Sequence, residues 1–572
     1  MSFFFNGRLW TSPATMSATN DSAMANQNLS VGNVLCLIGE STGGAPNTPL
    51  SFGSPAEAQA ALMGGELMTA AMKAFNPSDE TGGPATVICI RVNPAVQSTL
   101  ALKDASANSV IDLTSQDYGQ YTNGIKAKIA AGSLSGLQAT VQLGTSYYVG
   151  DNLGRNAFTL QYTGAAATAT MAITNSAITL SAPTGTVVGT VDLTTYQTVQ
   201  QVVDYINTIP GFSATVSGAS GTTLALNGLD SVTSQDVKTA LYTVTANLQA
   251  VVDWFNSQAQ PYVTATRPAG AGAPPAIVGF TYLSGGSDGV TTNTNWGNAF
   301  TALQSVDVQW ITPISSDQSI VAMCDAHCQY MSTVGRMERR SICGTALGTT
   351  DAIAISDALA INSDRTSLVH LGYYDYDPVT GAWTLYSPYM LAAMIAAAFS
   401  GLNPGTPLTN KTLTVRGLER ILLDPTDTDP LIQGGILCVT QYPSGFKVVQ
   451  SISTWLANSN YDKVEQSVGW AVDFTMRNVR NALDPLRGSK ASPILLNQAV
   501  SKTETQLRQL AVPEPQGPGV LVGDAKNPPY KNITATLSGD VVQVAFQCSP
   551  VIPDNYIAVT AALVPYSGTA TA

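Results

Sequence analysis

A strand–helix–strand pattern near the start of the chain is the feature that most limits how it can fold. Residues 33–38 form a short apolar run between two glycines, which is typical of a buried strand. Residues 54–57, Ser-Pro-Ala-Glu, form a capping box with proline at the first helical position, and the helix they begin should run toward Phe75. A second buried strand is expected at residues 85–92. This βαβ order predicts a parallel pair of strands with a right-handed crossover.

Residues 96–281 differ from the preceding part of the chain in composition. This stretch is rich in Thr, Ser, Ala and Gly and contains short alternating segments such as residues 188–195, which predicts a β-rich insertion of one or two subdomains. One helix is expected at residues 198–208, where valine and isoleucine side chains recur on one face. A Pro/Gly/Ala-rich linker at residues 267–276 should close the insertion.

A second α/β stretch follows the insertion. Strands are expected at residues 308–313 and 366–371, with a helix at 319–337 between them. Ser387 and the proline after it should begin an Ala-rich helix that ends before Gly401.

The last third of the chain again mixes strands and helices. A pair of strands is expected at residues 434–440 and 447–453, around a Pro-Ser-Gly turn. Residues 462–483 carry an apolar stripe at helical spacing, and strands are expected at residues 540–546 and 555–565.

Composition narrows the classes of protein to consider. The chain has 572 residues, which suggests several domains, and 44% of them are apolar, so large cores can be buried. Only 11% are charged, and 26 basic residues face 38 acidic ones without any basic run, which argues against a nucleic-acid groove. The longest apolar stretch, Met390–Phe399, is too short to cross a bilayer.

The first residues of the chain and its cysteines indicate the cellular compartment in which the protein is made. The first ten residues lack the basic start and long apolar run of a signal peptide, so we expect synthesis in the cytoplasm. Seven scattered cysteines favour reduced, packed thiols over a disulfide framework.

The segment from Gly39 to Gly43 has the G-x-S-x-G pattern of a serine hydrolase, with Ser41 as the nucleophile. Such a nucleophile must be followed at once by a helix and needs a base. Prolines keep the chain in a loop after Gly43, and only two histidines, His327 and His370, are present. A structural loop is the favoured interpretation, with a hydrolase as an alternative.

Two clusters contain side chains of the kinds that bind metal ions. Cys324, His327 and Cys328 would share one helix face, with Cys343 beyond, but a second ligand pair at zinc spacing is missing. The acidic residues between Asp424 and Asp429 lack the glycine and glutamate of a calcium loop. No nucleotide fingerprint is present, so no cofactor, no metal and no catalytic residue is predicted.

A Gly-Gly-x-Asp-Gly turn at residues 285–289 is followed by the amphipathic stretch Trp296–Leu303 and then by an apolar strand. Further blocks follow the same order along the chain, namely 35–52, 336–340, 387–401, 452–455 with the helix after it, and 550–557. In their order and spacing these blocks resemble the tail sheath proteins of contractile bacteriophages. Residues 96–281 do not match the family.

The resemblance implies a multidomain α+β or α/β fold. A mixed-sheet α/β core would carry an inserted β-rich outer domain, and a C-terminal α/β inner domain would carry strand-exchange arms. The expected division is an N-terminal exchange arm at 1–30, a core at 31–95 plus 282–400, the outer insertion at 96–281, the inner domain at 401–550, and a C-terminal strand or arm at 551–572.

The resemblance also implies a structural function without enzymatic activity. The subunit would polymerise as stacked hexameric rings around a tail tube and contract to drive the tube through the host envelope. Its partners would be copies of itself, the tube protein, the baseplate and the tail terminator or neck proteins, with no nucleic acid and no direct membrane insertion. It would lie in the virion after assembly in the host cytoplasm.

Two sets of residues are expected to contact partners. Terminal strands would pair with neighbouring subunits through Phe3, Phe4, Phe5, Tyr556, Ile557, Val559 and Leu563, because unpaired strands at the chain ends favour β-augmentation. Lys463, Arg477 and Arg480 make the region of residues 462–490 locally basic, and we expect them to face an acidic tube or a neighbouring subunit. A β-rich extracellular adhesin is the alternative reading from another class.

Overall fold

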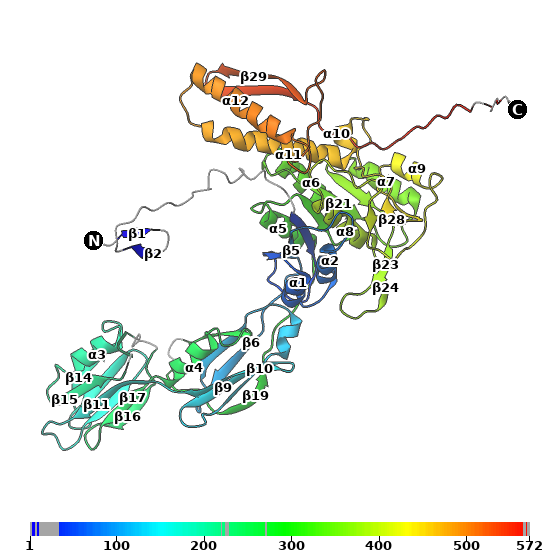
Figure 1. Cartoon of the computed structure of the whole chain (residues 1–572). Helices are drawn as coiled ribbons and strands as arrows, with labels where there is room; N and C mark the ends of the chain where they lie inside the picture. Colours follow the sequence, from blue (N-terminus) through cyan, green and yellow to red (C-terminus); the bar gives the residue numbers. More distant parts are fainter. Residues whose placement is uncertain are drawn as a thin grey trace.

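The computed structural model describes residues 3–5, 8–10, 34–218, 220–222, 228–268, 272–563, 565 and 568. In Figure 1 the chain forms a central α/β core with two β-rich modules on one side and a helical C-terminal region on the other.

A six-stranded sheet organises the core. Its strand order is β22-β21-β20-β3-β5-β4, and every neighbouring pair is parallel except β4 with β5. The strands are β3 (Val34–Gly39), β4 (Pro49–Phe52), β5 (Thr86–Arg91), β20 (Trp310–Pro313), β21 (Arg340–Gly344) and β22 (Thr366–Val369). Strands β3 and β5 are buried nearly throughout, which explains their continuous apolar sequence.

Helices cover both faces of this sheet. Leu35 and Leu37 of β3 point into one apolar cluster, whereas Cys36 and Ile38 point into another on the opposite face. The first cluster includes α2 (Glu66–Ala74) and α8 (Pro388–Ser400), with α1 (Pro55–Leu62) beside them. The second includes α5 (Asn293–Leu303), α6 (Gln318–Thr333) and α7 (Asp351–Ile361).

The insertion forms two β-rich modules, each with its own apolar cluster. The proximal module contains the sheets β10-β9-β8-β19 and β18-β7-β6 with helix α4 (Asn247–Phe255). Its strands are β6 (Thr99–Lys103), β7 (Ser109–Ser115), β8 (Lys126–Ala131), β9 (Leu137–Leu143), β10 (Ser146–Leu153), β18 (Val263–Thr266) and β19 (Val278–Tyr282).

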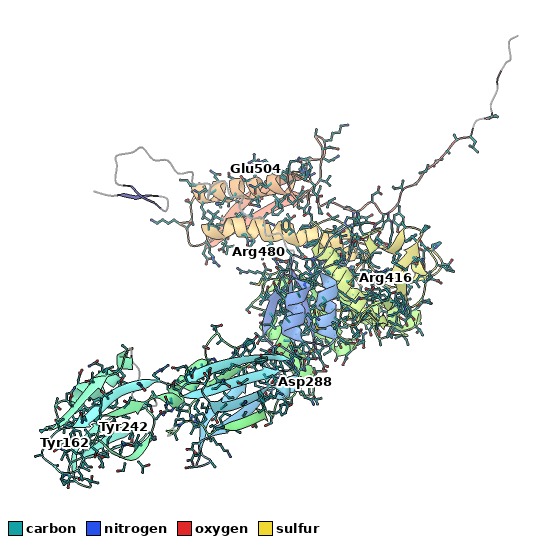
Figure 2. The ribbon with its side chains drawn as sticks, turned by 60° about the horizontal axis from the view of Figure 1, so that its bottom comes forward. Tyr162, Tyr242, Asp288, Arg416, Arg480 and Glu504 are labelled. Carbon is teal, nitrogen blue, oxygen red and sulfur yellow. The ribbon has the colours of Figure 1, made fainter. Side chains whose placement is uncertain are left out.

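The distal module is inserted into the proximal one. It contains the sheets β15-β11-β17 and β14-β13-β12-β16 with helix α3 (Val199–Ile206), and Tyr162 and Tyr242 mark it in Figure 2. Its strands are β11 (Asn156–Tyr162), β12 (Thr170–Ile173), β13 (Ala177–Ser181), β14 (Val187–Asp192), β15 (Phe212–Val216), β16 (Val232–Asp236) and β17 (Tyr242–Thr245).

Small sheets and a helical region complete the chain. Two three-stranded sheets have the orders β24-β23-β26 and β25-β28-β27. Their strands are β23 (Tyr373–Tyr376), β24 (Trp383–Tyr386), β25 (Thr412–Leu413), β26 (Gly417–Leu418), β27 (Val439–Tyr442) and β28 (Gly445–Val448). Helix α9 (Thr428–Gln433) lies between β26 and β27 in the sequence. The helices α10 (Tyr461–Val464), α11 (Gln466–Leu483) and α12 (Pro493–Leu510) precede the hairpin of β29 (Tyr530–Ser538) and β30 (Val541–Cys548).

Several predicted elements are confirmed. Ser54 caps α1, because its hydroxyl accepts the backbone N–H of Glu57. Thr198 caps α3 through a reciprocal capping box with Gln201. The predicted helix at residues 462–483 is interrupted at Glu465, whose extended backbone separates α10 from α11.

One prediction about the chain ends is wrong, and one stays a prediction. In the N-terminal arm predicted at residues 1–30, β1 (Phe3–Phe5) pairs antiparallel with β2 (Arg8–Trp10), and exchange of this arm between subunits stays a prediction. The strand expected at residues 555–565 does not form in its described part, because an isolated strand has no partner for its backbone groups. The side chains of Phe3, Phe4 and Phe5 lie outside the described structure.

Candidate assembly surfaces

A buried ion-pair network joins α11 to the core sheet. Arg340, at the start of β21, donates from Nε to Asp473 Oδ2 at 2.9 Å and from Nη1 to Gln466 Oε1 at 2.9 Å. Arg365 donates to the same Asp473 oxygen at 2.5 Å. Burial lowers the pKa of Arg340, and the carboxylate of Asp473 opposes this effect. The single carboxylate therefore holds two guanidinium groups, and α11 is fixed to the end of the sheet.

Arg477 and Arg480 lie one and two turns further along α11. Arg477 is only 7% exposed, and its guanidinium binds the Glu338 carboxylate at 3.2 Å and both oxygens of Asp307 at 2.9 and 3.0 Å. Arg480, labelled on α11 in Figure 2, pairs with the same Glu338. Within the single chain, both arginines are thus paired with carboxylates of the core. A contact between this helix and a tube stays a prediction.

Lys463, the third residue expected at that surface, is placed differently. Its ammonium donates to Asp364 Oδ2 at 2.6 Å and lies 5.8 Å from the centre of the Trp455 ring. Its side chain is 36% exposed, so it is the most accessible of the three cations.

The hairpin β29–β30 offers open strand edges. Within the described chain these two strands form a sheet only with each other. Side chains from one side of the hairpin, including Ile533 and Phe546, pack against the cluster formed by α11 and α12. The outer edges of both strands therefore present unpaired backbone N–H and C=O groups.

The C-terminal segment leaves the body of the protein at Asn555. The Asn555 amide donates to Glu465 Oε1 at 2.8 Å, in the break between α10 and α11. Beyond it, large apolar side chains are almost fully exposed, namely Tyr556 at 84%, Ile557 at 81%, Val559 at 85% and Leu563 at 95%. Figure 1 shows this segment extending away from every other element. Contiguous exposed apolar surface of this kind is typical of interaction sites.

The loop after β3 does not have the geometry of a nucleophile elbow. Ser41 is 5% exposed, its hydroxyl donates to the Gly43 carbonyl at 2.8 Å, and its N–H donates to the Asn93 side chain. His327 contacts Arg339 and His370 contacts Asp351, so neither histidine is bonded to Ser41. The geometry supports the structural interpretation of this loop.

The cysteine and aspartate clusters have local structural roles. Cys324, Cys328 and Cys343 are buried in the apolar cluster beneath α6. Asp424 accepts from Thr428 and from Tyr442, whereas Asp427 accepts from the Leu423 N–H. In the described part of the chain, no group of three or more His, Cys, Asp or Glu side chains is placed to hold a metal ion.

Sequence comparison identifies relatives along nearly the whole chain. The tail sheath protein of Bacillus phage SP01 is 28% identical over 595 residues, covering 99% of this chain and 97% of the relative. The putative tail sheath protein of Enterococcus phage phiEF24C is 28% identical over 496 residues, covering 82% and 84%. No family model matches the chain.

Solved structures agree on the fold. The sheath tail protein of Listeria innocua superposes with a TM-score of 0.55 at 13% identity, covering 91% of this chain and 95% of that one. The sheath tail protein of Desulfitobacterium hafniense superposes with a TM-score of 0.51 at 13% identity, covering 95% and 100%. The chain therefore shares the multidomain fold of these two proteins.

The sequence relatives show that the chain is a homologue of phage tail sheath proteins and a structural subunit of a contractile sheath. Its homologues are structural proteins rather than enzymes, in agreement with the prediction made from the sequence.

Proposed function

We propose that this chain polymerises as stacked hexameric rings around a tail tube and contracts by rearrangement of its subunits. The observation that carries the proposal is the exposed C-terminal segment beyond Asn555, together with the open edges of β29 and β30. A terminal segment from one subunit that adds to the hairpin of the next would pair its backbone and cover Ile557 and Val559.

Such strand exchange would supply links that survive a large movement. The globular bodies are rigid, because their sheets are covered on both faces and α11 is fixed by buried ion pairs. Contraction would then repack whole bodies against each other, while the extended links act as hinges. The free energy would come from a more extensive set of contacts between subunits.

The proposed partners follow from this arrangement. Copies of the chain would form the lattice, the tube would lie inside it, and baseplate and terminator or neck proteins would lie at its two ends. Assembly would take place in the host cytoplasm and the product would be a component of the virion. None of the described helices is long and apolar enough to cross a bilayer.

The proposal can be tested by negative-stain imaging of the purified full chain. We expect tubular polymers or ring stacks from the natural sequence and dispersed particles from the double variant Ile557→Asp/Val559→Asp. These substitutions should leave the folded body intact, because both side chains are exposed in the single chain. Ile494→Asp/Val522→Asp is a matched control on the same end of the molecule, where Ile494 is 69% and Val522 is 55% exposed.

Polymers formed equally well by the tail variant and the control would refute strand exchange through this segment. Dispersed particles from the natural sequence, with and without added tube protein, would refute the sheath assembly itself.

A further inference from the structure

The proximal module presents one face of its four-stranded sheet to solvent. Ala127 and Ile129 of β8 and Val141 of β9 point inward, into the cluster that contains α4. Because side chains alternate along a strand, Lys126 and Lys128 lie on the opposite, outer face.

The strand register lines up one row of side chains across this outer face. Tyr282 of β19 pairs with Lys126 of β8, Lys126 pairs with Gln142 of β9, and Gln142 pairs with Tyr147 of β10. Three strand spacings separate the two tyrosines, so the row is about 14 Å long. Tyr147 is 65% exposed and Tyr282 is 59% exposed.

Both lysines lie next to aromatic rings. The Lys126 ammonium lies 4.9 Å from the centre of the Phe280 ring and 5.6 Å from that of Tyr282, and the Lys128 ammonium lies 5.8 Å from that of Phe280. Phe280 is itself 45% exposed. Among the described residues, no acidic side chain forms an ion pair with either lysine. The face thus offers two positioned, unneutralised cations in a chain whose net charge is −12.

We propose that this face of the β10-β9-β8-β19 sheet binds an anionic polysaccharide. Exposed aromatic rings pack against the C–H faces of sugar rings, and Tyr147 and Tyr282 would provide two such platforms. The ammonium groups of Lys126 and Lys128 would pair with carboxylate or phosphate groups along the polymer. Gln142 lies between the lysine and the second tyrosine, and its amide nitrogen donates to the Gly144 carbonyl at 2.8 Å, so its amide oxygen would accept a hydrogen bond from a sugar hydroxyl.

The geometry favours a polysaccharide over a protein partner. Lys126 and Gln142 separate the rings of Tyr282 and Tyr147 along the row, whereas protein interfaces concentrate aromatic anchors in a desolvated apolar centre. The charge of the ligand follows from complementarity with the two unpaired lysines. In Figure 1 the module lies on the opposite side of the core from α12 and the hairpin β29–β30, so the inference does not depend on the proposed assembly.

The test uses the full chain and measures binding by affinity electrophoresis in gels that contain a soluble polymer. The probes are alginate, neutral dextran, inorganic polyphosphate and polyglutamate. We expect retardation by alginate that falls about tenfold in Tyr147→Ala/Tyr282→Ala and in Lys126→Gln/Lys128→Gln, since lost stacking or pairing contributes about 1–2 kcal/mol. Tyr330→Ala and Lys490→Gln/Lys502→Gln, which change exposed residues elsewhere, should bind as the natural chain does.

Four outcomes would decide the matter. Loss of alginate binding in both double variants, with normal melting temperatures, supports the proposal. Stronger retardation by polyglutamate than by alginate would overturn it in favour of a protein ligand. Binding of polyphosphate that matches alginate and ignores the tyrosine substitutions would overturn it in favour of unspecific charge attraction. No retardation by alginate would overturn it outright, whatever the chain does in the imaging experiment.

Discussion

At the scale of single residues, the decisive feature is the sharing of one carboxylate by two buried guanidinium groups. Arg340 and Arg365 come from the core, and Asp473 comes from α11, more than a hundred positions later. Removal of one partner from a buried ion pair leaves an uncompensated charge, which costs far more than the pair contributes as a whole.

We therefore predict that Asp473→Asn destabilises the chain by about 3–5 kcal/mol, because two arginines lose their counter-charge. Urea unfolding followed by tryptophan fluorescence would measure this, since Trp470 lies on the same helix. Asp484→Asn is the matched control. It removes an exposed carboxylate that pairs with Arg487 at 3.3 Å and should change stability by less than about 1 kcal/mol. An equal effect of the two substitutions would contradict the network.

His327 makes the fold sensitive to acid. Burial, and then the neighbouring Arg339, lower its pKa from 6.5 to about 3. A histidine with a lowered pKa stays neutral in the folded state while the unfolded chain takes up a proton. Its destabilising contribution is therefore absent above pH 6.5 and grows as the pH falls toward 3, by roughly 1.4 kcal/mol per pH unit.

The expected result is a melting temperature that falls between pH 6.5 and 4 in the natural chain and falls less in His327→Gln. Calorimetry across that range measures the difference. A variant whose pH profile runs parallel to that of the natural chain would show that other groups cause the acid sensitivity.

At the scale of elements, the close approach of α8 to β21 depends on a glycine. A methyl group on Gly344 would overlap the backbone nitrogen of Tyr389 in the first turn of α8. The helix is buried along nearly its whole length, so it has no room to shift.

Gly344→Ala should therefore cost about 1–3 kcal/mol through overpacking. Thermal unfolding of the purified variant checks this. Gly279→Ala is the matched control, because a methyl group there would meet no atom within 4 Å. An unchanged melting temperature of Gly344→Ala would mean that β21 and α8 can move apart without a loss of stability.

Elements were predictable where pattern and local chemistry agreed. The capping box at Ser54, the one-sided valines of α3 and the unbroken apolar runs of β3 and β5 each predicted the observed element. Helix α7 was missed, because its alanine and isoleucine side chains are spread around the whole helix and form no one-sided apolar stripe. Helix α4 was missed because it interrupts a segment whose composition favours strands.

The candidate surfaces were harder to predict than the elements. Positive charge at Arg477 and Arg480 is visible in the sequence, but their partners Asp307 and Glu338 lie far away along the chain. Only the folded structure shows that these positive charges form ion pairs within the chain. By contrast, exposure of Tyr556 and Leu563 follows from their position near the chain end, where local sequence supplies no pairing partner.

At the scale of the whole molecule, one buried arginine joins the core to the insertion. The Arg91 guanidinium donates to Asp288 at 2.9 Å, to the Gly44 carbonyl at 2.9 Å and to the Tyr118 carbonyl at 3.0 Å. Asp288 lies in the chain that returns to the core, Gly44 lies in the core loop after β3, and Tyr118 lies in the proximal module after β7. Figure 2 shows Asp288 at this junction between the core and the proximal module.

We predict that Arg91→Met loosens the junction without unfolding either side. Small-angle scattering should show a larger radius of gyration, and limited proteolysis should cut faster between residues 92 and 98. Arg155→Met removes an exposed ion pair with Asp253 and serves as the control. Identical scattering from Arg91→Met and the natural chain would show that the remaining contacts suffice to hold the insertion in its orientation relative to the core.

The same junction bears on how such a chain changes over generations. Backbone hydrogen bonds between Val96 and Ser287 and between Thr99 and Ser284 join the chain that enters the insertion to the chain that leaves it. The two ends of the insertion therefore lie side by side. A sequence of almost any length can occupy this position without stretching the core. New domains could therefore be acquired, exchanged or engineered at this junction without a change in the fold of the core.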